Sequence, residues 1–364
     1  MELEAELLGE VQDTGLLDGE RPLIVLLSGG RDSTCLLDLA ARICGPARLV
    51  ALHLNYGLRT TADRDQEACR KLCERLQVEL VTANPGKPPA GNLQAWARNE
   101  RYQAAAALAA DRSSQRIRPD GGPAQAKPAA ILSGHTATDQ LETVLYRLIS
   151  SPSRRALLGM RSRERLTLPF TVNGATDRDQ VDGAVKVTIE LLRPLLTVSR
   201  DQTGAYCRAR GLDWVDDESN LSGKYVRNRI RNELLPLIGE LHPGAERNIL
   251  ALTARLREEQ ELLEQLVEAE LAGQQIALAQ LRQLPPALAR MIVQRLADDF
   301  RGEPAPGVAP RLEEILALSA SGTAHLDLPH RIRATMRDGM LHFTMTDPKP
   351  RDRGPAKAGD GYEG

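Results

Sequence analysis

Apolar and polar positions alternate over the first two hundred residues in units of one short apolar run and one longer amphipathic segment. The first run, LIVLL at 23–27, is continuously apolar, which is typical of a strand buried on both faces of a parallel sheet. Repeated strand–helix units of this length predict an α/β fold with a doubly wound parallel sheet. Strands are predicted at 23–27, 48–54, 78–82 and 130–132, and helices at 33–43, 62–76, 92–110 and 138–149.

After residue 215 the alternation ends and helical periodicity takes over. Apolar spacing predicts helices at 250–271, 278–301 and 309–319, and Asp338-Gly339 predicts the turn of a β-hairpin at 331–345. Two polar segments, 113–128 and 161–187, are predicted to be loops or insertions. We therefore expect a catalytic α/β domain at 1–220, a linker and a smaller, mainly helical domain at 221–345 that ends in the hairpin, and a disordered tail at 346–364.

Composition narrows the class of protein. A chain of 364 residues with 42% hydrophobic residues is long enough for two globular domains. Its net charge of −2 excludes a uniformly basic nucleic-acid coat but permits local basic patches, and its 3% aromatic content argues against a surface that stacks many bases. No apolar run approaches the roughly 20 residues that span a bilayer. The five cysteines form no CxxC pair, which argues against a disulfide framework and favours the cytoplasm.

A short polar segment, SGGRDS, follows the first predicted strand and opens the first predicted helix. Glycines let the backbone turn sharply and approach a ligand, and a helix N-terminus offers free amides and a positive dipole end. Two hydroxyls add donors, so the segment suits phosphate, although it is neither a Walker loop nor GxGxxG. An incidental tight turn is the alternative interpretation. The candidate phosphate-binding residues are Ser28, Gly29, Gly30, Arg31, Asp32 and Ser33.

Two carboxylates follow the fourth predicted strand. Asp139 and Glu142 are three positions apart and share one face of the predicted helix, and His135 lies just before it. Paired carboxylates can hold Mg²⁺ or accept hydrogen bonds from an ammonium group. A solvated polar helix face is the alternative. Their position at the carboxyl end of a parallel strand, where open α/β sheets bind ligands, favours a functional site.

A basic cluster lies beyond the α/β segment. Lys224, Arg227, Arg229 and Arg231 place four cations in eight residues with no acidic residue among them. Positions 224, 227 and 231 share a helical face, which suits contacts with RNA phosphates. A second basic run at 154–165 is equally consistent with a solvated surface.

Several further motifs follow SGGRDS in order along the chain. They are HLNYGLR at 53–59, ARNERY at 97–102, GHTATDQLET at 134–143, LRPLL at 192–196, WVDDESN at 214–220 and YVRNRIR at 225–231. The segment SGGRDS resembles the PP-loop of the ATP pyrophosphatase superfamily, which cleaves ATP between its α and β phosphates. The whole succession, which covers about 23–236, resembles the bacterial tRNA(Ile)-lysidine synthetases.

This resemblance implies a ligase of the PP-loop type. ATP would adenylate the C2 oxygen of the wobble cytidine in a tRNA(Ile) with a CAU anticodon and release pyrophosphate, and free L-lysine would then displace AMP at C2 to form lysidine. It implies that the PP-loop binds ATP and that Asp32 and Asp139 bind Mg²⁺. It also implies that Asp139 and Glu142 handle lysine or the metal, and that Arg98 and His135 lie near the phosphates. A homodimer is compatible with this reading.

Two other functions stay open. Another PP-loop tRNA-modifying enzyme, such as a cytidine thiolase, is disfavoured because related thiolases need cysteines in CxxC-like arrangements. A non-catalytic RNA-binding protein that keeps the nucleotide fold would be expected to have a damaged phosphate loop, whereas SGGRDS is intact. The chain departs from the family at Tyr56, where histidine is usual, and at 147–153, where a Gly-rich turn is usual.

Overall fold

The computed structural model describes residues 2–58, 62–89, 91–114, 128–151, 154–170, 185–215, 226–271, 273, 275–302 and 304–346. Contacts divide the chain into two compact units, Met1–Ala254 and Arg255–Gly364. The sequence analysis placed the domain boundary at 220. The contacts place it at Ala254 instead, so residues 221–254 belong to the first unit. The expected disordered tail lies outside the described residues, except for Thr346.

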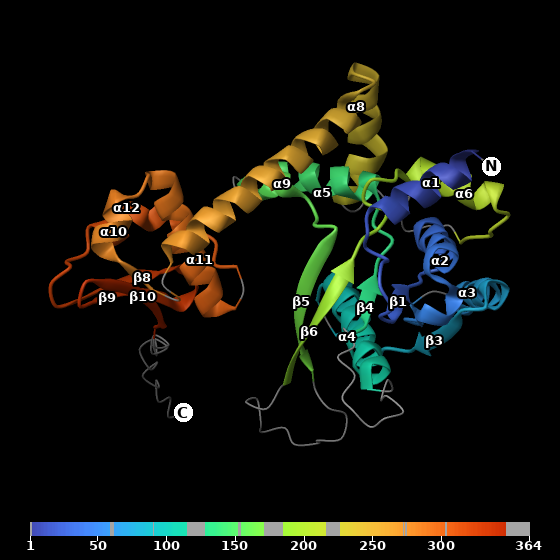
Figure 1. The fold of residues 1–364 in the computed structure, drawn as a ribbon, viewed down its shortest axis with the longest axis horizontal. Coiled ribbons are helices and arrows are strands. Elements are labelled where there is room, and N and C mark those ends of the chain that lie inside the picture. The colour runs from blue at the N-terminus through green and yellow to red at the C-terminus, as the bar shows by residue number, and fades with distance from the viewer. Residues whose placement is uncertain are drawn as a thin grey trace, which may run out of the picture. The chain divides into compact units, whose positions relative to one another are not determined.

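A six-stranded sheet in the order β3-β2-β1-β4-β6-β5 forms the centre of the first unit (Figure 1). Strands β1, β2, β3, β4 and β6 are mutually parallel where they pair, which confirms the predicted parallel sheet, and β5 pairs antiparallel with β6. The strands are β1 (Leu23–Leu26), β2 (Leu49–Leu54), β3 (Glu79–Ala83), β4 (Ala130–Leu132), β5 (Arg163–Phe170) and β6 (Val185–Leu192).

Strands β5 and β6 correct the sequence analysis, which predicted a loop over 161–187. The two strands pair over their full lengths, from Arg163 opposite Leu192 to Phe170 opposite Val185. Both strands alternate polar and apolar residues, but the polar stretch between them dominates the composition of the segment. Residues 171–184 lie outside the described part of the chain.

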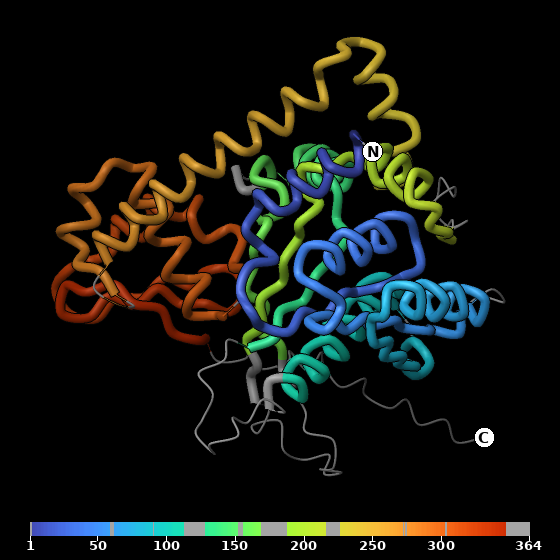
Figure 2. Tube along the Cα trace, turned by 45° about the vertical axis from the view of Figure 1, so that its right-hand side comes forward, coloured from blue at the N-terminus to red at the C-terminus, as the bar shows by residue number. Residues whose placement is uncertain are grey.

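Helices cover both faces of this sheet (Figure 2) because successive strand residues point to opposite sides. Leu23, Val25 and Leu27 belong to the core beneath α1, α2, α3 and α6, whereas Ile24 and Leu26 belong to the core beneath α4. The sheet is therefore doubly wound, as predicted. These helices are α1 (Glu2–Asp13), α2 (Arg31–Cys44), α3 (Ala62–Leu76), α4 (Leu93–Ser114), α5 (Ala137–Ser150) and α6 (Arg200–Ala209).

A satellite core joins α5 to the segment that follows α6. Leu141 and Leu145 of α5 pack with Ile230 and Leu235. This segment contains a π-helical turn, so it is not the uniform α-helix on which the predicted basic face depended. Its elements are α7 (Val226–Arg229), the π-helical turn Ile230–Leu234, α8 (Leu235–Leu241) and α9 (Ala245–Glu270).

The second unit has its own core and an antiparallel sheet in the order β7-β10-β9-β8. The predicted hairpin is confirmed: Asp338 and Gly339 both have positive φ, as its two-residue turn requires. Strands β7 and β8 were not predicted. The elements are β7 (Ile276–Ala277), α10 (Leu278–Gln283), α11 (Pro286–Arg301), α12 (Leu312–Leu316), β8 (Thr323–Leu328), β9 (Ile332–Arg337) and β10 (Met340–Met345). Within the described ranges, no helix is both long and apolar enough to cross a membrane.

Candidate active site

The predicted phosphate-binding segment forms a tight loop between β1 and α2. Gly29 has a φ of 82°, a backbone conformation that residues with a Cβ rarely adopt. The Ser33 hydroxyl donates to the Gly30 carbonyl at 2.9 Å and accepts from the Ser28 amide at 3.2 Å, which holds the loop closed. No side chain from the described part of the chain caps α2, so the amides of its first turn are available to an anion.

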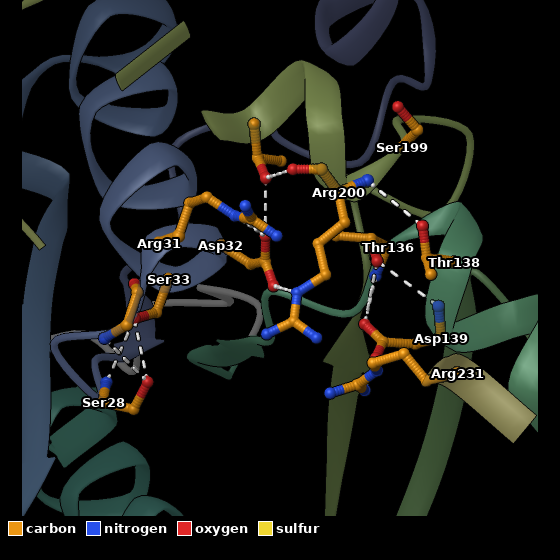
Figure 3. Close-up of polar contacts among 12 residues, drawn as sticks. Ser28, Arg31, Asp32, Ser33, Thr136, Thr138, Asp139, Ser199, Arg200 and Arg231 are labelled. Carbon is orange, nitrogen blue, oxygen red and sulfur yellow. Dashed lines mark hydrogen bonds and ion pairs between the residues drawn. The ribbon is translucent and has the colours of Figure 1, made fainter. Parts of the chain in front are cut away.

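Asp32 lies in this first turn between two guanidinium groups (Figure 3). Its carboxylate accepts a hydrogen bond from the Thr203 hydroxyl at 2.5 Å, and its oxygens lie 3.3 Å from Arg200 Nε and 3.6 Å from Arg31 Nε. Burial raises the pKa of Asp32, and the Thr203 hydrogen bond and the Arg200 charge oppose this rise. The carboxyl group is thus held in a partly desolvated, cation-rich position.

The loop between β4 and α5 packs directly against this turn. A Cβ on Gly134 would lie 3.1 Å from backbone atoms of Asp32 and Ser33, so only glycine fits at this position without a backbone shift. Thr136 then caps α5: its hydroxyl accepts from the Asp139 amide at 3.4 Å, and in return its amide and hydroxyl donate to Asp139 Oδ2 at 2.8 and 2.9 Å. The contact brings Asp139 near enough to Asp32 for its charge to raise the pKa of Asp32.

Glu142 lies on the same helix and is only 4% exposed. Arg231 forms a bidentate pair with it, in which Nη2 donates to Oε2 at 2.9 Å and Nε donates to Oε1. Arg231 Nη2 also lies 3.5 Å from Asp139 Oδ1. Burial raises the pKa of Glu142, and Arg231 counteracts that rise. Arg231 therefore faces the carboxylate pair, and its predicted contact with RNA phosphates stays a prediction.

The other residues of the basic cluster have different surroundings. Arg227 is exposed and lies over the Tyr146 ring, with 5.5 Å between its guanidinium carbon and the ring centroid. Arg229 is exposed and pairs with Glu233 at 2.9 Å. Lys224 lies outside the described residues. Among the described residues of the cluster, Arg227 is the exposed cation for which no carboxylate partner is seen, so it best matches the predicted contact with RNA phosphates.

A cavity of about 660 Å³ opens at the carboxyl ends of β1, β2 and β4. Of the residues chosen from the sequence, its wall contains Ser28, Gly30, Arg31, Asp32, Ser33 and His135. Arg98 is not in that wall: it is exposed and lies over the Tyr102 ring, while Arg101, three positions further along α4, lines the cavity. Asp139 and Glu142 are not part of that wall: Asp139 lies near enough to Asp32 to affect its pKa, and Glu142 lies beside Asp139 on α5.

His135 enters the cavity as a neutral group. Its Nδ1 lies 2.6 Å from the Ser133 hydroxyl, and burial lowers its pKa to about 4, with nearby arginines, among them Arg193 and Arg98, adding to the shift. A neutral imidazole can exchange hydrogen bonds with a ligand but adds no positive charge near pH 7.

Tyr56, where histidine is usual, ties the end of β2 to α4. Its hydroxyl donates to the Ala97 carbonyl at 2.9 Å, and its ring meets the edge of Trp96 at a centroid distance of 5.7 Å. The tyrosine also lines the cavity. In this chain the position therefore braces the cavity wall with a neutral side chain.

Arg200 and Thr203 are site residues that the motifs did not reveal. Both lie in the first turn of α6, which begins after a capping box made by Ser199 and Gln202. The signal was present as S-x-x-Q a few residues after LRPLL. However, only the packing of α6 beside α2 brings these side chains to Asp32, from 168 and 171 positions away along the chain.

The loop, the sheet order and a family model together define the class of this domain: the model, which describes a PP-loop domain, matches residues 2–238. The chain is 34% identical over 361 residues to the tRNA(Ile)-lysidine synthase of Symbiobacterium thermophilum, with 92% of this chain and 67% of that protein covered. The protein of the same name from Pseudomonas syringae pv. tomato is 32% identical over 256 residues, with 70% and 48% covered. The chain belongs to the tRNA(Ile)-lysidine synthase family.

The chain spans about two thirds of the length of the first of these relatives and about half of the second. Among solved structures, the U34-tRNA thiolase NcsA from Methanococcus maripaludis has a TM-score of 0.50 at 15% identity. The alignment covers 70% of this chain and 80% of the thiolase. At this identity the similarity shows that the two proteins share a fold, and nothing about function is inferred from it.

Proposed function

We propose that the chain ligates L-lysine to C2 of the wobble cytidine of a tRNA(Ile) with a CAU anticodon. In the first step the C2 oxygen attacks the α-phosphorus of ATP, and the bond to the bridging oxygen breaks to release pyrophosphate. In the second step the lysine ε-nitrogen attacks C2, loses a proton, and displaces AMP with the C2–O bond electrons. Family membership and one observation support this: the loop that leads into α5, which carries Asp139 and Glu142, packs directly against the phosphate loop at Asp32.

ATP fits the cavity by its chemistry. The first-turn amides of α2 and the hydroxyls of Ser28 and Ser33 would bind its phosphates, and Leu26 and Leu54 offer apolar wall for the nucleoside. Mg²⁺ also fits, because it prefers oxygen donors and usually shares its coordination between one or two carboxylates and substrate phosphates. Asp32 and Asp139 would hold the ion, which would neutralise phosphate charge. The described residues contain no group of three or more metal-binding side chains, and a shared site of this kind needs none.

Lysine would enter beside the same carboxylates. Glu142 and Asp139 already pair with one cationic side chain, Arg231, which supports a role for them in binding a cation with N–H donors. The wobble base would have to leave its stack to reach the ATP, as in other enzymes that modify a base. A reducing, cytoplasmic setting remains our expectation for this chemistry.

Thiolation is the weaker candidate on a specific observation. All five cysteines are free, and four of them are buried. Burial raises the pKa of Cys69 and of Cys73 to about 12, so neither is a thiolate near neutral pH.

The direct test incubates the purified chain with ATP, isotopically labelled L-lysine and a tRNA(Ile) transcript with a CAU anticodon. Digestion and mass spectrometry should find one added lysine residue on the wobble cytidine. Reactions without ATP and with a transcript that carries uridine at the wobble position serve as controls. Incorporation of sulfur, or no ATP-dependent change in the tRNA, would contradict the proposal.

The tRNA contact has its own test. Replacing Arg227 by glutamine should weaken tRNA binding and reduce the slope of log Kd against log salt by about 0.7 to 0.9, the contribution of one phosphate contact. The matched control is Lys71→Gln, which removes an exposed cation from α3. Filter binding over a salt series measures both. An unchanged slope for Arg227→Gln would assign Arg227 to packing on Tyr146 instead.

A further inference from the structure

Arg200 and Arg31, the two arginines on either side of Asp32, each have a buried Nε that forms no hydrogen bond within the described residues. Arg193 and Arg210 also approach carboxylates, and both donate hydrogen bonds to them, to Glu164 and Asp38 respectively. The buried Arg200 Nε forms no hydrogen bond, although Asp32 Oδ2 lies 3.3 Å away. No hydrogen bond links this guanidinium to any other side chain within the described ranges. Its donors therefore remain available in a wall of the cavity.

A hydrogen bond holds the Arg200 backbone, and an ion pair with Asp32 orients its guanidinium group. The Arg200 amide donates to the Thr138 hydroxyl at 3.2 Å, so the start of α6 is fastened to the start of α5. The side chain reaches from there toward Asp32 and the neighbourhood of Asp139 (Figure 3), and it is only 24% exposed. Its charge lowers the pKa of both Asp32 and Glu142. Arg200 is thus electrostatically coupled to the phosphate end and to the carboxylate pair.

We infer that Arg200 is a catalytic residue of adenylyl transfer and binds the α-phosphate of ATP. The inference rests on the proposed function. The amides and serines of the phosphate loop would hold the pyrophosphate portion, so the α-phosphate would lie further along the cavity, beside Arg200. As the C2 oxygen of cytidine bonds to the α-phosphorus and the bridging oxygen departs, negative charge builds on the α-phosphate oxygens and the leaving group. A preorganised, desolvated guanidinium group stabilises that charge.

The same position predicts a role in the second step. When lysine attacks C2, the C2–O bond breaks and AMP departs with the electron pair. The phosphate of AMP is the former α-phosphate, so it would leave while still bound by Arg200. A lysine at this position would supply charge but not the planar pair of donors that matches two phosphate oxygens.

The test measures the two steps separately in the full chain. With α-labelled ATP and no lysine, Arg200→Gln should lower the single-turnover rate of tRNA adenylation by about 100- to 1,000-fold, the typical effect of removing one charge-stabilising donor. Arg200→Lys should recover part of that rate. Retention of ATP in equilibrium binding should change much less, because the pyrophosphate contacts remain. Arg208→Gln, on the same helix but exposed, should match the wild type.

The outcomes separate the inference from its premise. If wild-type protein adenylates no tRNA, the proposed function fails. If the wild type is active and Arg200→Gln adenylates within threefold of it, Arg200 is not catalytic. If Arg200→Gln loses ATP binding and melts several degrees lower than Arg208→Gln, Arg200 is a structural partner of Asp32, and the inference is likewise overturned.

Discussion

Replacing Asp32 by asparagine is expected to reduce ATP-dependent release of pyrophosphate by at least about 100-fold, while the protein stays folded. The substitution removes the anion that lies between Arg31 and Arg200 and a ligand proposed for Mg²⁺. Because burial raises the pKa of Asp32, the ionised carboxylate is less stable in the folded chain than in water. Asparagine removes that penalty, so the melting temperature should stay the same or rise.

Asp201→Asn is the matched control, because Asp201 is an exposed acid in the first turn of α6. It should change neither pyrophosphate release nor melting temperature. A pyrophosphate-release assay with tRNA present and a thermal melt on each variant complete the experiment. Wild-type turnover in Asp32→Asn would contradict the role of this loop as the ATP site.

Replacing Arg231 by methionine should destabilise the first unit by about 3 kcal/mol, because it leaves the buried Glu142 carboxylate without its bidentate partner. For a unit of this size that corresponds to a fall of about 6–12 °C in the melting temperature. Arg229→Met removes an exposed arginine two residues away that pairs with Glu233 across one helical turn, and it should cost only about 0.5 kcal/mol.

The double variant Arg231→Met with Glu142→Gln tests the cause. Removing the stranded charge should restore most of the lost stability. Thermal melts of the wild type, the single variants Arg231→Met and Glu142→Gln, and the double variant give the coupling between the two positions. Equal losses in the single and double variants would show that Arg231 stabilises the fold by packing rather than by its charge.

The sequence predicted well those helices and strands whose ends are set by residues close to them in the chain. The helix at 62–76 and the strand at 130–132 agree with the structure to the residue, and Asn92 caps α4 through a hydrogen bond to the Ala95 amide, which confirms the expected helix start. The phosphate loop was also visible, because one hexapeptide contains all of its parts.

The expected homodimer is not tested by the structure of a single chain and stays a prediction.

What the sequence could not reveal depends on long-range packing. Arg200 and Thr203 reach Asp32 only because α6 lies on α2, where Tyr206 and Arg210 both hydrogen-bond to the buried Asp38. Arg98 and Arg101 both belong to the ARNERY motif, and the orientation of α4 decides which one lines the cavity. Arg231 belonged to a run of cations that suggested RNA, and only the fold shows the acidic partner that it faces.

The order of the strands also has a consequence for how the protein is made. The phosphate loop and its neighbour β4 are present once residue 136 has been synthesised, but β6 and α6, which complete the sheet beside β4 and deliver Arg200, come some sixty residues later. At about 5–20 residues per second, a nascent chain spends several seconds with the glycine-rich loop formed and its second cation missing. Among the described residues that line the cavity or contact Asp32, only Val215 leaves the ribosome after Arg200 and Thr203. The nucleotide site is therefore completed only after most of the first unit has already emerged.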